Sequence, residues 1–154
     1  MTNNYFKEMI RLADSIADQA HSGQTDKIGR PYITHPRRVA FAVRKLAPEN
    51  MRVEAQIVAL LHDTVEDTGV TLDYLARYFS VSIVDAVDAL TKRKGETLEQ
   101  SIARVRANEL ARLVKHADIA DNTDPERTAL LDEKTRERLA KKYAKSLTLL
   151  SLGE

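Results

Sequence analysis

The sequence contains no cysteine among its 154 residues. This absence excludes disulfide bonds and every metal site built on thiolates, including the structural zinc sites of zinc fingers. Long hydrophobic runs are lacking too, because no apolar stretch approaches the roughly 18 to 20 residues that span a bilayer. The N-terminal segment carries acidic residues and lacks the basic start and apolar core of a signal peptide. The sequence therefore predicts a cytoplasmic protein with no membrane partner.

An excess of charge of one sign is also missing. The chain has 24 basic and 23 acidic residues and a formal net charge of +1, with both signs interspersed. General nucleic-acid binders usually present a one-sided basic field. The sequence therefore predicts no general nucleic-acid binding, and it makes no prediction of oligomeric state.

Glycine and proline are scarce, with five and four residues respectively. Four of these nine residues lie within 23–36 and another lies at 95, and there is no internal repeat, low-complexity linker or shift in composition. A chain of this length can bury a real core without disulfides or other cross-links. We therefore expect one domain that spans residues 1–154.

Apolar residues recur every three or four positions through most of the chain, and no segment shows convincing period-two alternation. This spacing is typical of amphipathic helices and predicts an all-α fold of about seven or eight helices. The helices are expected over about 5–20, 35–46, 52–67, 71–79, 80–91, 97–107, 109–121 and 133–150. Residues 23–34 are expected to form an irregular loop. Thr71 is a candidate N-cap, and Asp124–Pro125 marks a break or a new N-cap.

The end of the apolar segment at 52–67 carries four titratable side chains, His62, Asp63, Glu66 and Asp67. Their spacing of three and four residues places them on one side of a helix. Carboxylates at a helix C-terminus are disfavoured by the helix dipole, and like charges at this spacing repel. A cation would resolve this conflict, with the first pair as ligands and the second pair left for proton transfer. The alternative is a solvated acidic helix end with an incidental histidine.

Three other segments carry weaker signals. His35 lies in a proline-bounded segment, where a cap or a packed side chain is the plainer interpretation. Asp118 and Asn122 lie four residues apart, which suits one ligand and one hydrogen-bonding amide, or else a solvated polar stripe. Lys27 lies in a glycine-containing loop that could approach a phosphate.

Taken together, the order of His35, the adjacent pair His62-Asp63, and Asp118 resembles the HD phosphohydrolase superfamily. That fold is a helical bundle with a metal ion at its centre. A closer resemblance is to the hydrolase domain of the RelA/SpoT-type alarmone enzymes and to the small free-standing alarmone hydrolases. The matching segments are AHSGQTDKIGRPYITHPRRVA, ALLHDTVEDT, ALTK and VKHADIADN, spread over residues 20–122. The HDTVEDT segment combined with GQxxKxGxPYxxHP is highly specific to this branch.

The resemblance implies a role for each of these side chains. It makes His35, His62, Asp63 and Asp118 the ligands of one divalent metal ion. Such a mixed nitrogen and oxygen set, like the family itself, favours Mn²⁺ over a closed tetrahedral zinc site. Glu66 and Asp67 become the catalytic pair that handles the attacking water, with the choice of base between them left open. Lys27 and Asn122 become contacts to a nucleotide substrate.

The reaction implied is removal of the 3′-pyrophosphate from guanosine 3′,5′-bis(diphosphate), ppGpp, or its pentaphosphate, giving GDP or GTP. The 154 residues leave no room for a synthetase domain, so a monofunctional hydrolase is expected. Departures at Asp26, His116 and Asp121 keep open a hydrolase acting on an adenosine alarmone or a nucleoside phosphate. A non-catalytic nucleotide-binding module is a further alternative, against which the presence of both Glu66 and Asp67 argues.

Overall fold

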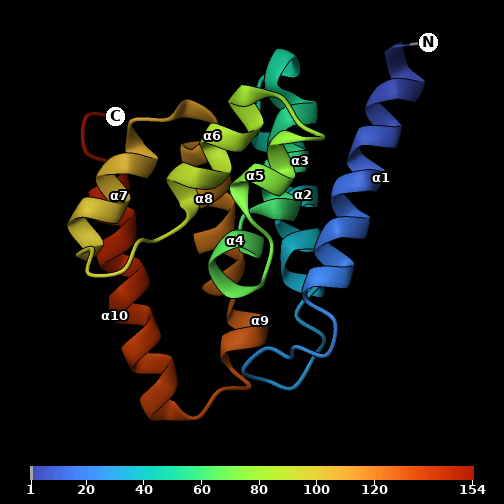
Figure 1. Ribbon diagram of the computed structural model, residues 1–154. Coiled ribbons are helices and arrows are strands. Elements are labelled where there is room, and N and C mark those ends of the chain that lie inside the picture. The colour runs from blue at the N-terminus through green and yellow to red at the C-terminus, as the bar shows by residue number, and fades with distance from the viewer. Residues whose placement is uncertain (1) are drawn as a thin grey trace.

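The computed structural model describes residues 2–154, and over these residues the chain folds into helices joined by turns and loops (Figure 1). The elements are α1 Thr2–Ala20, α2 Thr34–Leu46, η1 Glu49–Met51, α3 Arg52–Leu61, α4 Thr64–Asp67, α5 Leu72–Ala76, α6 Val81–Leu90, α7 Leu98–Arg106, α8 Glu109–Asn122, α9 Pro125–Thr128 and α10 Glu133–Leu150. This confirms the prediction of an all-α fold. Among the same residues, no helix is both long and apolar enough to cross a membrane.

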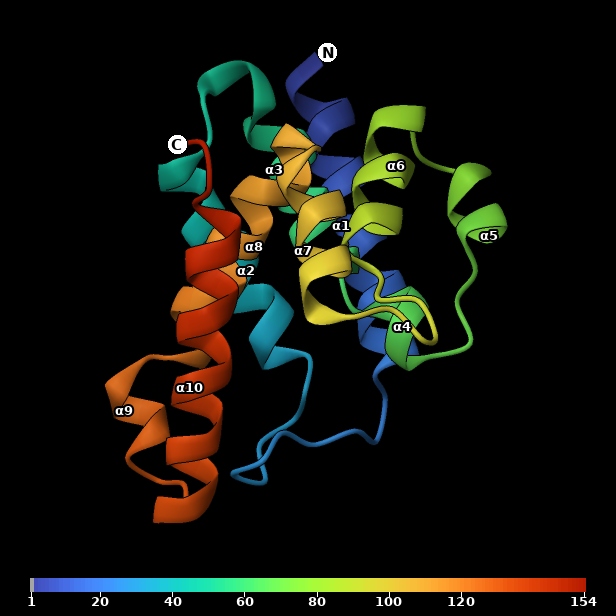
Figure 2. The same cartoon turned by 90° about the vertical axis from the view of Figure 1, so that its left-hand side faces the viewer.

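The helix α3 lies at the centre of the bundle. Its last five residues, Ile57–Leu61, are all buried, and α3 packs against α1, α2, α6 and α8. Burying one large aliphatic side chain contributes about 1.5–3 kcal/mol, so this segment anchors the core. The helices α9 and α10 lie on one side of the bundle and α4 and α5 on the other (Figure 2).

The single helix expected over 52–67 is wrong, because α3 ends at Leu61 and α4 begins at Thr64. Two side chains take carbonyls that a continuous helix would use. His62 Nδ1 donates to the carbonyl oxygen of Ala59 at 2.6 Å, and Thr64 Oγ1 donates to that of Leu61 at 2.8 Å. Side chains that bond nearby backbone groups compete with helix continuation in this way. The break leaves His62 and Asp63 in a turn. The single-turn helices α4 and α9 also raise the count above the seven or eight expected.

Polar caps set several other helix boundaries as the sequence predicts. Thr71 accepts a hydrogen bond from the amide of Tyr74, and Asp124 accepts one from the amide of Glu126. These bonds satisfy backbone N–H groups that the first turn of a helix leaves without partners. Thr71 is therefore confirmed as the N-cap of α5. Asp124 is the N-cap of α9, with a proline in its first turn.

The connection between α1 and α2 is an irregular loop, as expected. Asp26 organises it, because its Oδ1 accepts the amides of Ile28 at 3.0 Å and Arg30 at 2.9 Å. Gly29 has a φ of 84°, a conformation that glycine adopts without the steric cost paid by other residues. An isolated bridge between Thr25 and Pro31 closes the turn. The acidic side chain at position 26 therefore folds back onto its own loop.

A second connection, between α6 and α7, is held by Arg104. Its guanidinium donates to the carbonyl oxygens of Asp88, Ala89 and Thr91 at 2.7–3.3 Å. The same group forms two 2.8 Å bonds with the Glu96 carboxylate. One side chain thus closes the C-terminal end of α6 and fixes the loop that follows.

We predict that Arg104→Met lowers the free energy of unfolding by about 1–3 kcal/mol, because three partly buried carbonyls lose their donor. Urea denaturation followed by circular dichroism measures this change. Arg93→Met is the matched control, since Arg93 is exposed and reaches Asp88 only at 3.5 Å. Equal stability of Arg104→Met and the unaltered protein would show that the carbonyls find other donors.

Candidate metal centre

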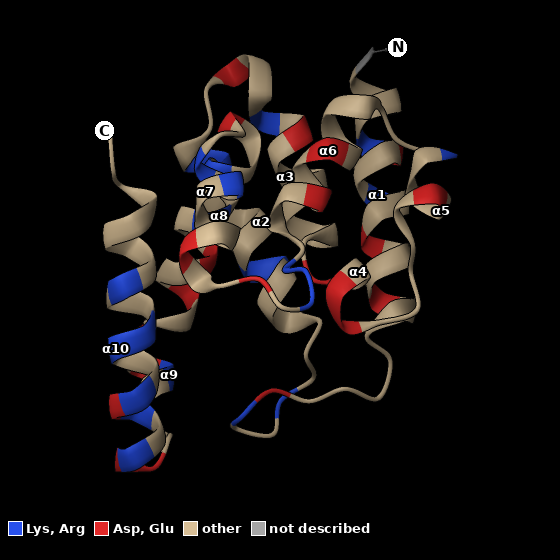
Figure 3. Ribbon diagram, turned by 60° about the vertical axis from the view of Figure 1, so that its left-hand side comes forward, with Lys and Arg blue, Asp and Glu red and all other residues tan. Residues whose placement is uncertain are grey.

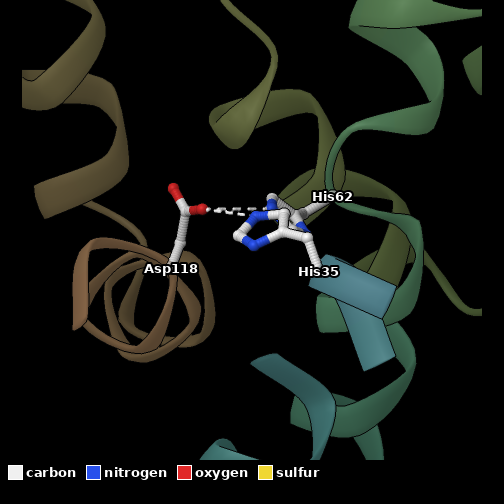
Figure 4. Close-up of side chains that lie close together, drawn as sticks. All are labelled: His35, His62 and Asp118. Atoms are coloured by element: carbon white, nitrogen blue, oxygen red, sulfur yellow. Dashed lines mark hydrogen bonds and ion pairs between the residues drawn. The ribbon is translucent and has the colours of Figure 1, made fainter. Parts of the chain in front are cut away.

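Three buried side chains from distant parts of the sequence meet at the centre of the bundle (Figure 4). His35 comes from the first turn of α2, His62 from the turn after α3, and Asp118 from α8. One ligand atom from each lies within 4.8 Å of the other two. His35 Nε2 is 2.9 Å from Asp118 Oδ1, and His62 Nε2 is 3.4 Å from the same oxygen. The geometry is therefore that of a group able to hold a metal ion.

The second ring nitrogen of His62 supports this interpretation. Its Nδ1 is fixed by the carbonyl of Ala59, whereas its buried Nε2 has no hydrogen-bond partner among the described residues. This atom lies 3.1 Å from Asp63 Oδ2 and 3.4 Å from Asp118 Oδ1, outside hydrogen-bond geometry. A buried polar atom without a partner costs free energy in a structural core. A cation among these atoms would satisfy it.

Asp63 lies beside this group. Its Oδ2 is 3.1 Å from His62 Nε2 and 3.7 Å from His35 Nε2, and it accepts a 2.6 Å hydrogen bond from the Tyr32 hydroxyl. Burial alone would raise the pKa of Asp63, but His62 lowers it to about 2. Asp63 is thus ionised and in reach of both imidazoles. Its role as a fourth ligand stays a prediction.

The carboxylate of Asp118 is compensated from several directions. Lys115 Nζ donates to its Oδ2 at 3.1 Å, and Asn122 Nδ2 donates to its Oδ1 at 3.0 Å. Burial raises the pKa of Asp118, but Lys115 and the two imidazoles more than offset that effect and hold it well below its usual range. Asn122 therefore lies where the sequence placed it, on the same helix face, but its observed contact is to Asp118.

The neighbouring carboxylates raise the pKa of both histidines and so favour their protonated forms. Burial lowers the pKa of His35, yet hydrogen bonds to Asp118 and Asp121 outweigh it and raise the pKa above its usual value. Burial likewise opposes charge on His62, but Asp63 and Asp118 raise its pKa well above the usual value. Acidic side chains thus make the centre attractive to positive charge.

Asp121, which the sequence marked only as an added carboxylate, lies behind His35. His35 Nδ1 donates to Asp121 Oδ2 at 2.7 Å. Arg38 donates two hydrogen bonds to the same carboxylate, at 2.9 and 3.1 Å, and Arg127 donates one at 2.7 Å. Burial raises the pKa of Asp121, but His35 and Arg38 lower it below its usual value.

The predicted catalytic pair lies on α4, next to the metal centre but outside the buried group. Glu66 and Asp67 are both exposed, and Glu66 Oε1 accepts a 2.6 Å hydrogen bond from the backbone amide of Lys92. Partial burial and the nearby Asp63 and Glu66 raise the pKa of Asp67. The structure therefore holds the Glu66 carboxylate in place through a backbone amide, whereas the surroundings of Asp67 raise its affinity for protons.

A cavity of about 240 Å³ opens beside His35. The residues that line it come from the 25–32 loop, α2, the end of α8 and its continuation, and α10: Thr25, Asp26, Lys27, Ile28, Tyr32, His35, Arg38, Asp121, Asn122, Arg127, Thr128, Leu131, Leu139 and Tyr143. Lys27 and Asn122 therefore both lie on its wall. His116 does not line the cavity, and its Nε2 lies 3.0 Å from Glu154 Oε1 at the C-terminal end.

Sequence reasoning missed the partners that hold the ligand side chains. Tyr32 lies three residues before His35, Lys115 three before Asp118, and Arg38 three after His35. Residues three apart share one side of a helix or turn, so this spacing is the signal that was available. The pairing of Arg38 with Asp121 depends on the packing of α2 against α8, which the sequence alone does not give.

Comparison with known proteins accords with this geometry. The sequence profile described as the HD domain matches residues 13–121, which include all four predicted metal ligands. The chain belongs to the HD domain family. A solved structure described as "A metazoan ortholog of SpoT hydrolyzes ppGpp and plays a role in starvation responses" matches this HD domain with a TM-score of 0.76. The match covers 93% of this chain and 85% of that one at 22% sequence identity, so it shows a shared fold.

Curated relatives carry names connected with guanosine nucleotides. A "Guanosine-3′,5′-bis(diphosphate) 3′-pyrophosphohydrolase" of Aquifex aeolicus is 32% identical over 87% of this chain and 20% of its own length. A "Probable GTP pyrophosphokinase" of Mycobacterium leprae is 36% identical over 74% of this chain and 15% of its own. The "Bifunctional (p)ppGpp synthase/hydrolase SpoT" of Escherichia coli is 40% identical over 54% of this chain and 11% of its own length. The HD domain chain therefore spans a fifth or less of the length of these relatives.

We predict that Lys115→Met destabilises the chelator-treated protein by about 1.5–3 kcal/mol, because a largely buried carboxylate loses a charged hydrogen-bond donor. Urea denaturation in EDTA measures the loss. Lys145→Met is the matched control: it breaks an exposed 2.7 Å pair with Glu99, and such pairs contribute about 0–1 kcal/mol. Equal effects of the two substitutions would contradict the assigned compensation of Asp118.

Proposed function

We propose that this HD domain is a metal-dependent 3′-pyrophosphohydrolase of ppGpp and its pentaphosphate. The observation that carries the proposal is the buried group of His35, His62 and Asp118 at the edge of a cavity that also holds basic side chains. A metal next to an anion-binding cavity is suited to phosphate-ester hydrolysis. The names of the Aquifex aeolicus and Escherichia coli relatives support the choice of substrate.

We further propose that the ion is Mn²⁺, held by His35, His62 and Asp118, with Asp63 as the fourth ligand. Two imidazoles and two carboxylates leave positions open for water and substrate in a metal that accepts five or six ligands. The orphaned Nε2 of His62 and the low pKa of Asp63 fit such a site. The ion would supply Lewis acidity toward a phosphoryl oxygen and make a nearby water more acidic.

The acidic pair on α4 performs the proton transfers in this proposal. A water oxygen forms a bond to the 3′-proximal phosphorus while the bond from that phosphorus to the ribose 3′ oxygen breaks. Glu66 or Asp67 takes the proton from the attacking water, and the leaving ribose oxygen gains one. The products are pyrophosphate and GDP or GTP. General acid–base catalysis of this kind contributes about 10²–10⁴ in rate.

Basic side chains explain how the cavity would attract a nucleotide polyanion. Three basic side chains lie on its wall and outnumber its two carboxylates. Asp121 is paired with both arginines, and Asp26 accepts the amides of its own loop. Burial, and then the positive charges of Lys115, Lys27 and Lys92, lower the pKa of Lys142. Figure 3 shows many basic residues, with a few acidic ones among them, along α10, and acidic residues on α4 at the opposite side of the view. We propose that Lys27 and Asn122 contact the nucleotide in this cavity.

The reaction is tested by incubating the Mn²⁺-loaded protein with ppGpp, its adenosine counterpart and nucleoside monophosphates. Release of pyrophosphate from ppGpp is expected, and the products are separated by ion-exchange chromatography. Orthophosphate from a monophosphate would instead identify a hydrolase of another nucleotide. Binding of ppGpp without turnover would identify a non-catalytic module.

We predict that Glu66→Gln lowers kcat by about 10²–10⁴-fold if Glu66 is the base, while Mn²⁺ affinity is retained. Asp67→Asn gives the same result if Asp67 is the base, so the two variants assign the role. Asp63→Ala should lose Mn²⁺ binding and activity together. Activity is measured as pyrophosphate release, and Mn²⁺ affinity is measured by isothermal titration calorimetry. Full activity in both Glu66→Gln and Asp67→Asn would sink the proposed proton transfer.

A further inference from the structure

The two histidines of the centre have different partners on the ring nitrogen that faces away from the cluster. His62 Nδ1 donates to a neutral acceptor, the carbonyl of Ala59, at 2.6 Å. His35 Nδ1 donates to a carboxylate, Asp121 Oδ2, at 2.7 Å. The side chains of His35 and Asp121 are both at least nine-tenths buried. The carboxylate is therefore a specific partner of this imidazole.

A histidine binds a metal ion through a ring nitrogen that presents its lone pair, so the other nitrogen must carry the proton. An acceptor for that proton fixes the tautomer and the ring orientation, and a charged acceptor also makes the ligating nitrogen more basic. We propose that Asp121 is a positioning residue of the metal centre, which directs His35 Nε2 toward the ion. This inference deepens the proposed function and rests on it.

The carboxylate of Asp121 is itself held in place by two arginines. Arg38, one turn after His35, contacts both carboxylate oxygens through its Nε and Nη2 atoms. Arg127 contacts Asp121 Oδ1 and the backbone carbonyl of the same residue. A carboxylate with two guanidinium partners has little freedom to rotate. The plane of the carboxylate, and with it the direction of the His35 ring, is thereby defined.

The two arginines also serve the cavity, because Asp121, Arg38 and Arg127 all lie on its wall. An uncompensated carboxylate at this place would repel an anionic nucleotide across a few ångströms of partly desolvated space. Two guanidinium groups offset that charge. The arrangement therefore lets an acidic residue orient a metal ligand inside a cavity that must accept phosphate groups.

The test measures binding of Mn²⁺ alone, with free Mn²⁺ followed by electron paramagnetic resonance. Asp121→Leu removes the acceptor and is expected to weaken Mn²⁺ binding about 10–100-fold, as is typical when such a partner of a metal-bound histidine is lost. Asp121→Asn keeps an accepting oxygen without the charge and should show a smaller loss. Arg38→Met keeps Asp121 but removes one of its two guanidinium partners, and a loss smaller than that of Asp121→Leu is expected.

The matched control is Asp14→Leu. Asp14 accepts two hydrogen bonds from Arg37 at 2.8 and 2.9 Å, but this pair lies on the surface between α1 and α2. Its Mn²⁺ affinity should stay within about twofold of the unaltered protein, as expected for a surface substitution. Circular dichroism of all variants identifies any that fail to fold. For those, Arg38→Met and Asp121→Asn decide the question.

A second readout addresses the tautomer directly. ¹⁵N chemical shifts of the histidine rings in the Zn²⁺-loaded protein should show the proton of His35 on Nδ1, and Arg38→Met should broaden or shift that signal. Unchanged Mn²⁺ affinity in Asp121→Leu, Asp121→Asn and Arg38→Met would overturn the inference even if ppGpp is hydrolysed. An intact dependence on Asp121 without hydrolysis of any nucleotide would support the inference and reject the proposed function.

Discussion

The buried carboxylate of Asp118 is the group around which the rest of the centre is organised. A carboxylate removed from water is stable only when donors and positive charges surround it. The chain meets this need with His35 and His62 from two other elements and with Lys115 one turn away on α8. Because these partners lie on α2, after α3 and on α8, their contacts also fix how the three elements pack. The contacts that compensate the charge of Asp118 therefore also hold α2, the end of α3 and α8 together.

This constraint explains why α3 must end where it does. His62 keeps regular helical backbone angles, but Asp63, with φ of −103° and ψ of −3°, departs from them. The resulting turn brings His62 Nε2 and Asp63 Oδ2 within 3.1 Å of each other. The hydrogen bonds to the carbonyls of Ala59 and Leu61 stabilise this turn. A local competition for backbone acceptors thus creates the geometry of the site.

Much of the fold and part of the site could be predicted from the sequence. Helical periodicity indicated the long helices, and short polar residues such as Thr71 and Asp124 indicated where helices begin. The order of His35, His62-Asp63 and Asp118 predicted a group that the structure does bring together. The break after Leu61 was not predicted, because apolar periodicity continues through it and the decisive bonds come from the side chains of His62 and Thr64. The partnership of Asp121 with Arg38 was missed because it joins residues 83 positions apart.

The hydrogen bond from the backbone amide of Lys92 to Glu66 links the α6–α7 connection to α4. Arg104 holds this connection through the carbonyl of Thr91, the residue just before that amide. A chain of backbone and side-chain bonds thus leads from α7 to the acidic turn beside the metal centre. With Glu66 in the proposed role of base, substitutions in the α6–α7 connection would change turnover more than metal binding. Among related domains, substitutions in the α6–α7 connection could therefore change the rate of hydrolysis while the metal-binding residues stay the same.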